Sequence, residues 1–443
     1  MKKNIFLIII DSLRADKFQN QNQTALIPNI EKLKKISFDF RNTISATDGT
    51  YASLGSLFTG KNPYNHNINW YHNHLNTTEY LKEFKKNGFE LFGTFPNQTF
   101  FKNISQVFDN SDLVDGDPYL RIFEGMGERI LVQLDELNLH EKPWFYYTHL
   151  MDLHTSKKLP TELENNTFGK TTWDKRLHIL DSWIGKMLQK IDLENTIVII
   201  TADHGEFDVD LDVDFGSIDN LQKLSRSIKP LLPKFMESHG LRLFVFLREK
   251  KRERVKNKLK KQTFEHNEQK KLLSRGHAPL YDDILKIPFL IHTPENYVGF
   301  SLQQVRQIDI FPTIIELLDF NINVKMDGVS LKPILENNSM PELYAYIENT
   351  PDPATDDEFG SLIGLRTSNY KFIKSRNNSD KNKLLFDLKN DPLEQNNIAT
   401  ENPNLVDKME QLLSKYRGIK NSEIHDDDET YKIKEELKKM GYI

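Results

Sequence analysis

The sequence of 443 residues contains no cysteine. This absence excludes disulfide bonds, thiolate metal ligands, a cysteine nucleophile and any catalytic aldehyde made from cysteine. Long apolar runs are also absent, since a helix that spans a bilayer needs about 20 apolar residues in a row. The opening apolar run Ile5–Ile10 stops at Asp11, without the small-residue cleavage site of a secretion signal. We therefore expect a cytoplasmic protein.

The sequence has little excess of charge of either sign. It contains 59 Lys and Arg against 64 Asp and Glu, which gives a net charge of −5. Nucleic-acid-binding domains usually carry a strong basic excess, so the whole-chain charge predicts no nucleic acid partner. A chain of this length can bury roughly 75% of its surface on folding, so it needs no covalent staples.

What the sequence does have is a regular alternation of strand-like and helix-like segments. The strand-like runs, rich in β-branched and aromatic residues, are Ile5–Ile10, Leu91–Phe95, Trp144–Leu150, Thr196–Thr201 and Ile287–His292. The helical patterns between them are Ile30–Ile36, Thr78–Lys86, Met126–Leu137 and Trp173–Ile191. This alternation predicts an α/β fold with a mostly parallel sheet sandwiched by helices. Ligands of such sheets bind beyond the carboxyl ends of the strands.

Two parts of the chain depart from this alternation. Residues 208–275 contain an apolar run, Leu241–Leu247, and a basic run, Arg248–Arg275, with 12 Lys and Arg against 4 Glu. We interpret them as an insertion that could form a lid over the main domain, residues 1–339. Residues 340–443 contain four short strand-like runs and two polar helices, and they predict a small α+β C-terminal subdomain with a helical tail.

Three of the predicted strands end in polar residues. Asp11 comes directly after the first strand, the His149–His154 stretch is at the end of the third, and Asp203 and His204 come after the fourth. Carboxylate and imidazole groups held at strand ends are suitable ligands for a divalent metal ion. An Asp after a strand is also a common helix cap, and Asp-His-Gly is also a common tight turn, so the pattern alone leaves both interpretations open.

Residues 45–60 read S-A-T-D-G-T-Y-A-S-L-G-S-L-F-T-G and place small and hydroxyl residues before a helical stretch, Tyr51–Phe58. Free N–H groups at a helix N-terminus favour a bound phosphate or sulfate. An ordinary helix cap is the alternative, and we expect Thr50 in that capping position. His154 and His277 each lie in a loop beside a strand or helix, where a histidine is usually a structural hydrogen bonder.

Eight motifs occur in an order that resembles the sulfatase branch of the alkaline phosphatase superfamily. They are N-I-F-L-I-I-I-D-S-L-R-A-D at 4–16, L-F-T-G-K-N-P-Y-N-H at 57–66, H-L-M-D-L-H-T at 149–155, T-A-D-H-G-E at 201–206, G-H-A-P-L-Y-D-D-I-L-K-I-P-F-L-I at 276–291, I-D-I-F-P-T-I-I-E-L-L at 308–318, D-G-V-S-L-K-P-I-L at 327–335 and L-F-D-L-K-N-D-P-L-E-Q-N-N at 385–397. The resemblance covers residues 1–394, apart from the 208–275 insertion.

The resemblance implies roles for particular residues. The family nucleophile lies nine residues before a Thr-Gly pair, here Thr59-Gly60, which makes Thr50 the implied nucleophile. The implied ligands of a divalent metal ion (Zn, Mn, Mg or Ca, as one or two ions) are Asp11, Thr50, Asp203 and His204. The implied substrate-binding residues are His154 and His277, which hold a second ion in two-metal members. Asp152 could join such a second site.

The departures from the family pattern concern the nucleophile. Sulfatases convert the Cys or Ser of a C/S-x-P-x-R motif to formylglycine, whereas residues 50–54 read T-Y-A-S-L. Ser12 replaces the second Asp of the N-terminal pair, and residues 95–98, F-P-N-Q, replace a sulfate-binding Lys-x-His pair. A threonine at this position is similar to nucleotide pyrophosphatase/phosphodiesterases, lipoteichoic acid synthases and phosphoethanolamine transferases.

The resemblance therefore implies a metal-dependent hydrolase or transferase of phosphoesters, most simply phosphodiesters, that works through a covalent Thr50 intermediate. The alternatives are a sulfuric ester hydrolase, and a binding protein that kept the fold without turnover. The expected substrate is a small-molecule, glycan-linked or lipid-linked anionic ester. The apolar and basic runs within residues 230–275 also suggest a peripheral membrane contact, for which a solvated helical lid or a homo-oligomer contact is the alternative.

Overall fold

The structure is a computed structural model that describes residues 3–19, 25–69, 74–75, 78–116, 121–154, 159, 166–206, 280–321, 326–349, 361–376 and 383–417. The 208–275 insertion, His277 and the tail from residue 418 onward lie outside the described residues. No helix within the described ranges is long and apolar enough to cross a membrane.

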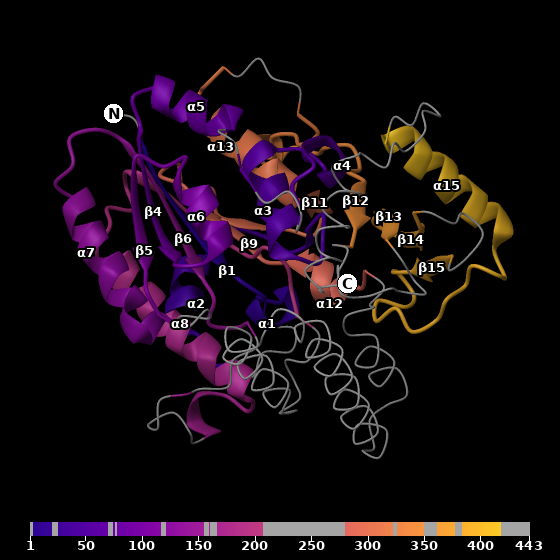
Figure 1. Cartoon of the computed structure of the whole chain (residues 1–443). Helices are drawn as coiled ribbons and strands as arrows, with labels where there is room; N and C mark the ends of the chain where they lie inside the picture. Colours follow the sequence, from indigo (N-terminus) through magenta and orange to yellow (C-terminus); the bar gives the residue numbers. More distant parts are fainter. Residues whose placement is uncertain are drawn as a thin grey trace, which may run out of the picture.

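The described strands form one large sheet and two small ones (Figure 1). Their bounds are β1 (Asn4–Ile10), β2 (Phe38–Phe40), β3 (Thr43–Ile44), β4 (Glu90–Pro96), β5 (Asn110–Val114), β6 (Trp144–Leu150), β7 (Thr196–Thr201), β8 (Lys286–Ile287), β9 (Phe289–His292), β10 (Gly299–Ser301), β11 (Val305–Arg306), β12 (Ala345–Glu348), β13 (Leu362–Arg366), β14 (Tyr370–Ser375) and β15 (Leu384–Asp387).

The described helices flank these sheets. They are α1 (Ala15–Phe18), α2 (Pro28–Lys34), α3 (Thr50–Thr59), α4 (Pro63–His66), α5 (Glu79–Lys86), α6 (Thr99–Ser105), the π-helical turn η1 (Ile122–Met126), α7 (Gly127–Leu137), the 3₁₀ turn η3 (Asn166–Phe168), α8 (Thr172–Leu188), α12 (Asp282–Leu285), the 3₁₀ turn η6 (Gln307–Asp309), α13 (Ile310–Leu317), α14 (Lys332–Leu335) and α15 (Pro403–Arg417).

The large sheet has eight strands in the order β10-β2-β9-β7-β1-β6-β4-β5. Strands β7, β1, β6, β4 and β5 pair in parallel, and β2 pairs in parallel with β10. Strand β9 pairs antiparallel with both β7 and β2, so it alone among these eight runs in the opposite direction. The predicted mostly parallel sheet of an α/β fold is confirmed.

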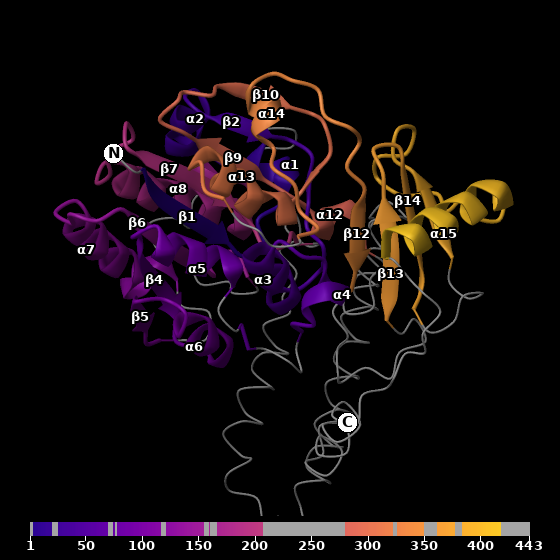
Figure 2. The same ribbon diagram turned by 90° about the horizontal axis from the view of Figure 1, so that it is seen from above.

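Helices cover both faces of the large sheet, as Figure 2 shows from above. Odd-numbered residues of β1 face a cluster formed with α3, α5, α6 and α13, whereas its even-numbered residues face a cluster formed with α2, α7 and α8. This period of two follows from strand geometry. Both faces of β1 are therefore buried, which explains why residues 5–10 are continuously apolar.

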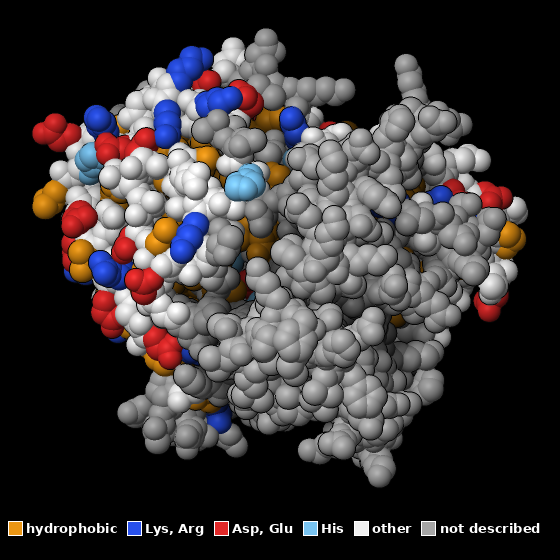
Figure 3. Space-filling view, in the orientation of Figure 1, with side chains coloured by type: hydrophobic (Ala, Val, Ile, Leu, Met, Phe, Trp, Pro, Cys, Tyr) orange, Lys and Arg blue, Asp and Glu red, His pale blue; other side chains and the backbone are white. Residues whose placement is uncertain are grey.

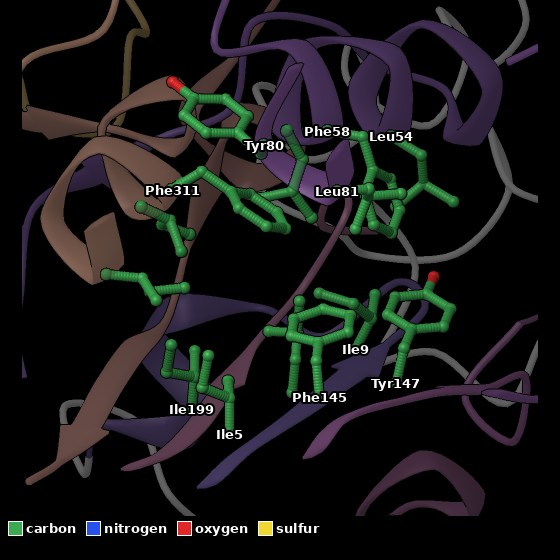
Figure 4. Packing of buried hydrophobic residues seen from close by; sticks show 14 of the residues in the cluster. Ile5, Ile9, Leu54, Phe58, Tyr80, Leu81, Phe145, Tyr147, Ile199 and Phe311 are labelled. Atoms are coloured by element: carbon green, nitrogen blue, oxygen red, sulfur yellow. The ribbon is translucent and has the colours of Figure 1, made fainter. Parts of the chain in front are cut away.

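The cluster under α3 is closely packed. Figure 4 shows Ile9, Phe145 and Tyr147 of the sheet pointing toward Leu54 and Phe58 of α3. Each of these five side chains is fully buried. Burial of a large apolar side chain contributes about 1.5–3 kcal/mol, so this cluster holds α3 firmly against the carboxyl ends of the strands.

Helix α3 ends at Gly60, which adopts the left-handed conformation with φ 63°. A side chain at this position would be strained, and a Cβ atom there would also lie 2.2 Å from the hydroxyl of Tyr80. The requirement for glycine explains why the helix ends in the Thr59-Gly60 pair.

The C-terminal sheet is antiparallel, in the order β12-β13-β14-β15. One face packs against α15 through residues such as Leu365 and Met409, and the other packs against Leu285 and Ile44 of the main part. The predicted α+β character of this part is confirmed, although of its two predicted polar helices only α15 lies within the described residues. The domain boundary at residue 339 remains a prediction.

Candidate functional site

The carboxyl ends of β6, β1 and β7 lie side by side and carry polar residues. Ile9 of β1 pairs with His149 of β6 and with Thr201 of β7. Asp11 and Asp203 follow two residues after these paired positions, so they lie at the same edge of the sheet as His149. The potential ligand atoms of His149, Asp11 and Asp203 lie within 4.8 Å of one another, and all three residues are buried.

Hydrogen bonds orient the two carboxylates. The Ser12 hydroxyl donates to Asp11 Oδ1 at 2.7 Å, and the Ser12 N–H donates to Asp203 Oδ1 at 3.3 Å. The N–H of His204 also donates to Asp203 Oδ1, at 2.8 Å. Ser12 makes both contacts from the left-handed conformation, with φ 63°, which is uncommon for a residue with a side chain. This backbone conformation therefore ties the two aspartates together.

Two other atoms of the cluster are suitable ligands for a divalent cation. His149 Nε2 and Asp203 Oδ2 are buried and have no hydrogen-bond partner among the described residues. A buried polar atom without a partner typically costs about 1–3 kcal/mol, so such atoms call for an explanation. Two carboxylate oxygens and an imidazole nitrogen converge here, and this donor set fits Zn²⁺ or Mn²⁺.

Thr50 lies above this cluster at the start of α3. Its Oγ1 donates to Asp11 Oδ2 at 3.3 Å and lies 3.5 Å from His204 Nε2. The residue that caps α3 is Gly49, and Thr50 is the first helical residue, which corrects the expectation that Thr50 itself caps the helix. Its hydroxyl is therefore directed to the polar cluster and not to the N–H groups of the helix.

His204 lies between Thr50 and Asp203. Its Nδ1–H donates to Gly205 O at 2.8 Å, which leaves Nε2 facing the cluster, 3.5 Å from Asp203 Oδ2. Burial alone would lower the pKa of His204, but the carboxylates of Asp203 and Asp11 raise it to about 9. The two buried carboxylates therefore favour the protonated form of the imidazole.

The two aspartates differ in their electrostatic surroundings. Burial raises the pKa of Asp203, and the neighbouring Asp11 carboxylate raises it further. Burial also acts to raise the pKa of Asp11, but His154, His149 and His204 together lower it below its usual value. Asp11 is therefore the carboxylate more firmly held in its charged form.

His149 belongs to the cluster, although sequence reasoning gave it no ligand role. It is fully buried, its Nδ1 forms a 2.9 Å hydrogen bond with the Tyr147 hydroxyl, and its Nε2 lies 3.5 Å from Asp11 Oδ2. Tyr147 and His149 are two residues apart on β6, so the alternation along the strand places both on the face covered by α3. That alternation was the available signal, since His149 occupies the last core-facing position of the strand.

The other predicted residues are placed differently. His154 is half-buried in the loop after β6 and lies near enough to Asp11 to lower the pKa of that carboxyl. Asp152 points elsewhere, because both of its carboxylate oxygens accept the Ile122 N–H, at 3.0 and 3.2 Å. Within the described ranges, His149, Asp11 and Asp203 form the one cluster of this kind, and it does not include Asp152. His277 lies outside the described residues.

The positions where the family pattern has cationic groups carry uncharged residues. Leu54, at the place of the motif arginine, is fully buried in the core beneath α3. Phe95 at the end of β4 is also fully buried. The side chain of Asn97 donates a hydrogen bond to Asp115. None of these three residues supplies a positive charge to the site.

Comparison with known proteins agrees with this architecture. The sulfatase family profile matches residues 3–320, and the profile of the C-terminal part of N-sulphoglucosamine sulphohydrolase matches residues 277–420. The uncharacterised sulfatase YidJ of Escherichia coli is 32% identical over 30% of this chain. The chain covers 25% of that relative's length, and 32% of an uncharacterised Haemophilus influenzae protein to which it is 26% identical.

Solved structures share the fold over nearly the whole chain. The phosphonate monoester hydrolase of Silicibacter pomeroyi has a TM-score of 0.68 and 14% identity, with 94% of this chain and 95% of that chain covered. A protein solved with its substrate D-glucosamine-2-N,6-O-disulfate has a TM-score of 0.66 and 16% identity, with 96% and 100% covered. The sulfatase family profile spans well over half of the chain, and so the protein belongs to the sulfatase family.

Proposed function

We propose that the protein hydrolyses, or transfers, phosphoesters through a covalent intermediate on Thr50, and that phosphodiesters are its preferred substrates. The observation that carries the proposal is the position of Thr50. Its hydroxyl is directed toward Asp11 Oδ2, at 3.3 Å, from the first residue of α3. A nucleophile in this position can meet a phosphorus atom while charge on the phosphoryl oxygens is stabilised by its surroundings.

We assign Asp11, Asp203 and His149 as the side chains that would hold a divalent cation, with His204 and Thr50 at its edge. Such a cation would lower the pKa of a hydroxyl beside it and stabilise negative charge on the transferred group. Asp11 accepts the hydrogen bond of Thr50 and so orients a lone pair of Oγ1 away from the carboxylate. His204 Nε2 lies 3.5 Å from Oγ1 and can interact with the attacking oxygen.

The reaction would proceed in two displacements. Thr50 Oγ1 forms a bond to phosphorus as the bond from phosphorus to the leaving ester oxygen breaks, and the proton lost by the hydroxyl is balanced by the one that the departing alcohol gains. Water, or an acceptor hydroxyl in a transferase, then attacks phosphorus, breaks the Oγ1–P bond and restores the threonine. His154 and His277 are proposed to bind the non-bridging oxygens.

The residues around Thr50 favour phosphate over sulfate chemistry. A threonine cannot be oxidised to the aldehyde that sulfatases use, and Leu54 in place of the motif arginine is buried in the core. Among phosphoesters, a diester carries one negative charge and a monoester about two at neutral pH, so a site with few cationic side chains suits the diester better. A sulfuric ester hydrolase is the second candidate, because the family and several relatives carry the sulfatase name.

A substrate panel with matched variants tests the proposal. We expect the purified enzyme with Mn²⁺ or Zn²⁺ to hydrolyse bis(p-nitrophenyl) phosphate much faster than p-nitrophenyl sulfate. Thr50→Ala should lower this turnover by a factor of about 10⁴–10⁶. The melting temperature should not change, because the hydroxyl makes no core contact. Thr50→Ser keeps a hydroxyl and should keep measurable activity. Fast sulfate hydrolysis by a protein with unmodified Thr50 would contradict the proposal.

We further propose a glycan-linked or lipid-linked anionic ester as the natural substrate, with peripheral contact at an anionic membrane through residues 230–275. This segment lies outside the described residues, so its charge alone supports the proposal: Arg248–Arg275 has a net charge of +8, from 12 basic and 4 acidic residues. Binding to phosphatidylserine vesicles should weaken steeply as salt rises. A protein that never binds such vesicles at low salt would contradict this part.

A further inference from the structure

We propose that Ser53 and Gln307 are positioning residues that hold Thr50 in place relative to Asp203. This inference rests on the function proposed for Thr50 and Asp203. Both side chains are fully buried, and neither belongs to the group of potential metal ligands. Both lie within hydrogen-bond distance of the backbone carbonyl of Asp203.

The Asp203 carbonyl oxygen collects side-chain donors from three separate parts of the chain. The hydroxyl of Ser45 donates to it at 2.7 Å, and the hydroxyl of Ser53 lies at 2.7 Å as well. The Gln307 amide donates to Ala202 O at 2.9 Å and to Asp203 O at 3.3 Å. A carbonyl oxygen has two lone pairs and each serine hydroxyl has one proton, so these contacts cannot all be donated at once. The Ser45 proton can also go to Thr47 O at 2.9 Å, and the Ser53 proton to Gln307 Oε1 at 2.9 Å. The groups therefore form one buried network around the Asp203 carbonyl.

Ser53 and Gln307 also contact each other, at 2.9 Å between Ser53 Oγ and Gln307 Oε1. Ser53 comes from α3, Gln307 from η6, and Asp203 from the end of β7. The three residues therefore join two helical elements to one strand end. Apolar packing such as that of Leu54 and Phe58 fixes the distance of α3 from the sheet but is non-directional, whereas hydrogen bonds are directional and fix its position along the strand.

The position of the Thr50 hydroxyl depends on this arrangement. Ser53 comes three residues after Thr50, so the two lie on neighbouring positions of the same helix face, one turn apart. When Ser53 is bonded to the Asp203 carbonyl, Thr50 Oγ1 lies above the Asp11 and Asp203 carboxylates. A small shift or rotation of α3 would move Oγ1 out of line for attack, and misplacement of a reacting group by about 1 Å can cost 10²-fold in rate.

Ser56 on the same helix is a matched control. It is a fully buried serine like Ser53, but its hydroxyl bonds to His66 Nε2 at 3.0 Å, away from the Asp203 carbonyl. The variants Ser53→Ala and Ser56→Ala therefore each delete one buried hydroxyl and one hydrogen-bonding group from α3. If Ser53 positions Thr50, Ser53→Ala should impair catalysis more than Ser56→Ala does. If both serines contribute only to stability, the two variants should have similar effects on catalysis.

The experiment compares Ser53→Ala, Gln307→Leu and Ser56→Ala in the full chain. We measure kcat and KM with bis(p-nitrophenyl) phosphate, the affinity for Mn²⁺ by calorimetry, and the melting temperature. Loss of a supporting hydrogen bond behind a metal ligand typically costs 10–100-fold in activity or metal affinity. We expect Ser53→Ala and Gln307→Leu to lose about 10–100-fold in kcat with little change in KM, and Ser56→Ala to keep both values.

The outcomes separate this inference from the proposed function. If kcat and Mn²⁺ affinity of both Ser53→Ala and Gln307→Leu match those of the unaltered enzyme, or if Ser56→Ala loses as much kcat, the positioning role is wrong. If Ser53→Ala does not fold, Gln307→Leu decides. If the unaltered enzyme turns over no phosphoester, the proposed function fails, and the Mn²⁺ affinities of the same variants still decide whether the Asp203 ligand is held by Ser53 and Gln307.

Discussion

Two histidines flank the buried aspartates, and they differ in what their ring nitrogens contact. His149 Nε2 has no hydrogen-bond partner within the described residues, while its Nδ1 is bonded to the Tyr147 hydroxyl. Metal-binding histidines commonly have the second ring nitrogen held in this way, which fixes the orientation of the ring. His204 instead faces Thr50 with its Nε2. We infer that His149 would bind the metal ion, whereas His204 interacts with the hydroxyl of the proposed nucleophile, Thr50.

This assignment gives different predictions for the two histidines. His149→Ala should weaken Mn²⁺ binding by about 10–100-fold in calorimetry, because it removes a ligand or its direct support. His204→Ala should lower kcat with a smaller loss of Mn²⁺ affinity. Chelation with EDTA should lower the melting temperature of the unaltered protein, since Asp11 and Asp203 then face each other without a cation, and should do so less in His149→Ala. Equal Mn²⁺ affinity in His149→Ala and the unaltered protein would contradict the assignment.

At the level of elements, the strands that build the site were predictable because they are buried on both faces. The run at residues 5–10 and the run at residues 196–201 are continuous apolar segments that end in polar residues, and the structure gives strands β1 and β7 there. Short strands such as Phe38–Phe40 carry too few residues for a recognisable pattern. The reversed direction of β9 was not predictable either, because the direction of a strand depends on its partners and not on its own residues.

The candidate functional residues also divide into those that the sequence predicts and those that it does not. Asp11, Asp203 and His204 could be selected as candidates because they follow directly after an apolar run, and the structure brings them close to one another. His149 lies inside the apolar run of β6, where a single histidine in the sequence looks like an ordinary core residue. Ser53 and Gln307 act through backbone contacts 150 and 104 residues distant in sequence, which no local pattern records.

Asp152 connects the loop after β6 to η1 through its hydrogen bonds with the Ile122 N–H. The protonation of the Asp152 carboxyl should therefore affect the stability of this contact. Burial raises the pKa of Asp152 to about 7, although the Ile122 N–H and the neighbouring Arg176 and Arg121 act to lower it. The folded protein therefore binds a proton that the unfolded chain releases near pH 4. The stability that this group contributes is present below pH 4 and is lost as the pH rises toward about 7.

Asp152→Asn should remove this part of the pH dependence. We expect the free energy of unfolding of the unaltered protein, measured in urea, to fall relative to that of the Asn variant between about pH 4 and pH 7. Above pH 7 the difference between the two proteins should level off. If the difference between them stays constant over this range, Asp152 is ionised throughout, and the interpretation of the junction is wrong.

For the molecule as a whole, the C-terminal sheet is joined to the main part by a buried ionic cluster. Lys371 of β14 is fully buried, and its Nζ lies 2.5 Å from Asp282 Oδ1 and 2.6 Å from Glu394 Oε1. Arg366 of β13 pairs with Asp282 as well, at 2.7 Å. The next residue, Asp283, pairs with Arg14 at 2.9 Å, three residues after Asp11. The cluster therefore connects the C-terminal sheet to the loop that carries a site residue.

Removal of one partner from this cluster should be costly. Lys371→Met leaves two buried carboxylates short of one cation, and we expect a loss of about 3–5 kcal/mol in the free energy of unfolding. Lys374→Ala on the same strand removes a partly exposed pair with Glu410 and should cost no more than about 1 kcal/mol. Equal losses from the two substitutions, measured by urea unfolding, would show that the buried cluster does not hold the two parts together.

Charged side chains of both signs are mixed on one face of the molecule. On the face shown in Figure 3, acidic and basic side chains of the described residues are interspersed, and no broad patch of one sign appears among them. The net charge of the whole sequence is only −5. The proposed function therefore rests on the polar cluster at the carboxyl ends of β6, β1 and β7 and not on a charged face.

The central claim is that Thr50 becomes covalently bonded to the group that is transferred. The most direct measurement is mass spectrometry of the enzyme quenched in acid during turnover of a slow phosphodiester, followed by identification of the modified peptide. We predict that the peptide containing Thr50 gains the phosphoryl group together with its remaining ester substituent, and that Thr50→Ala gains nothing. Turnover without any adduct on this peptide, or an adduct on another residue in the unaltered enzyme, would contradict the account.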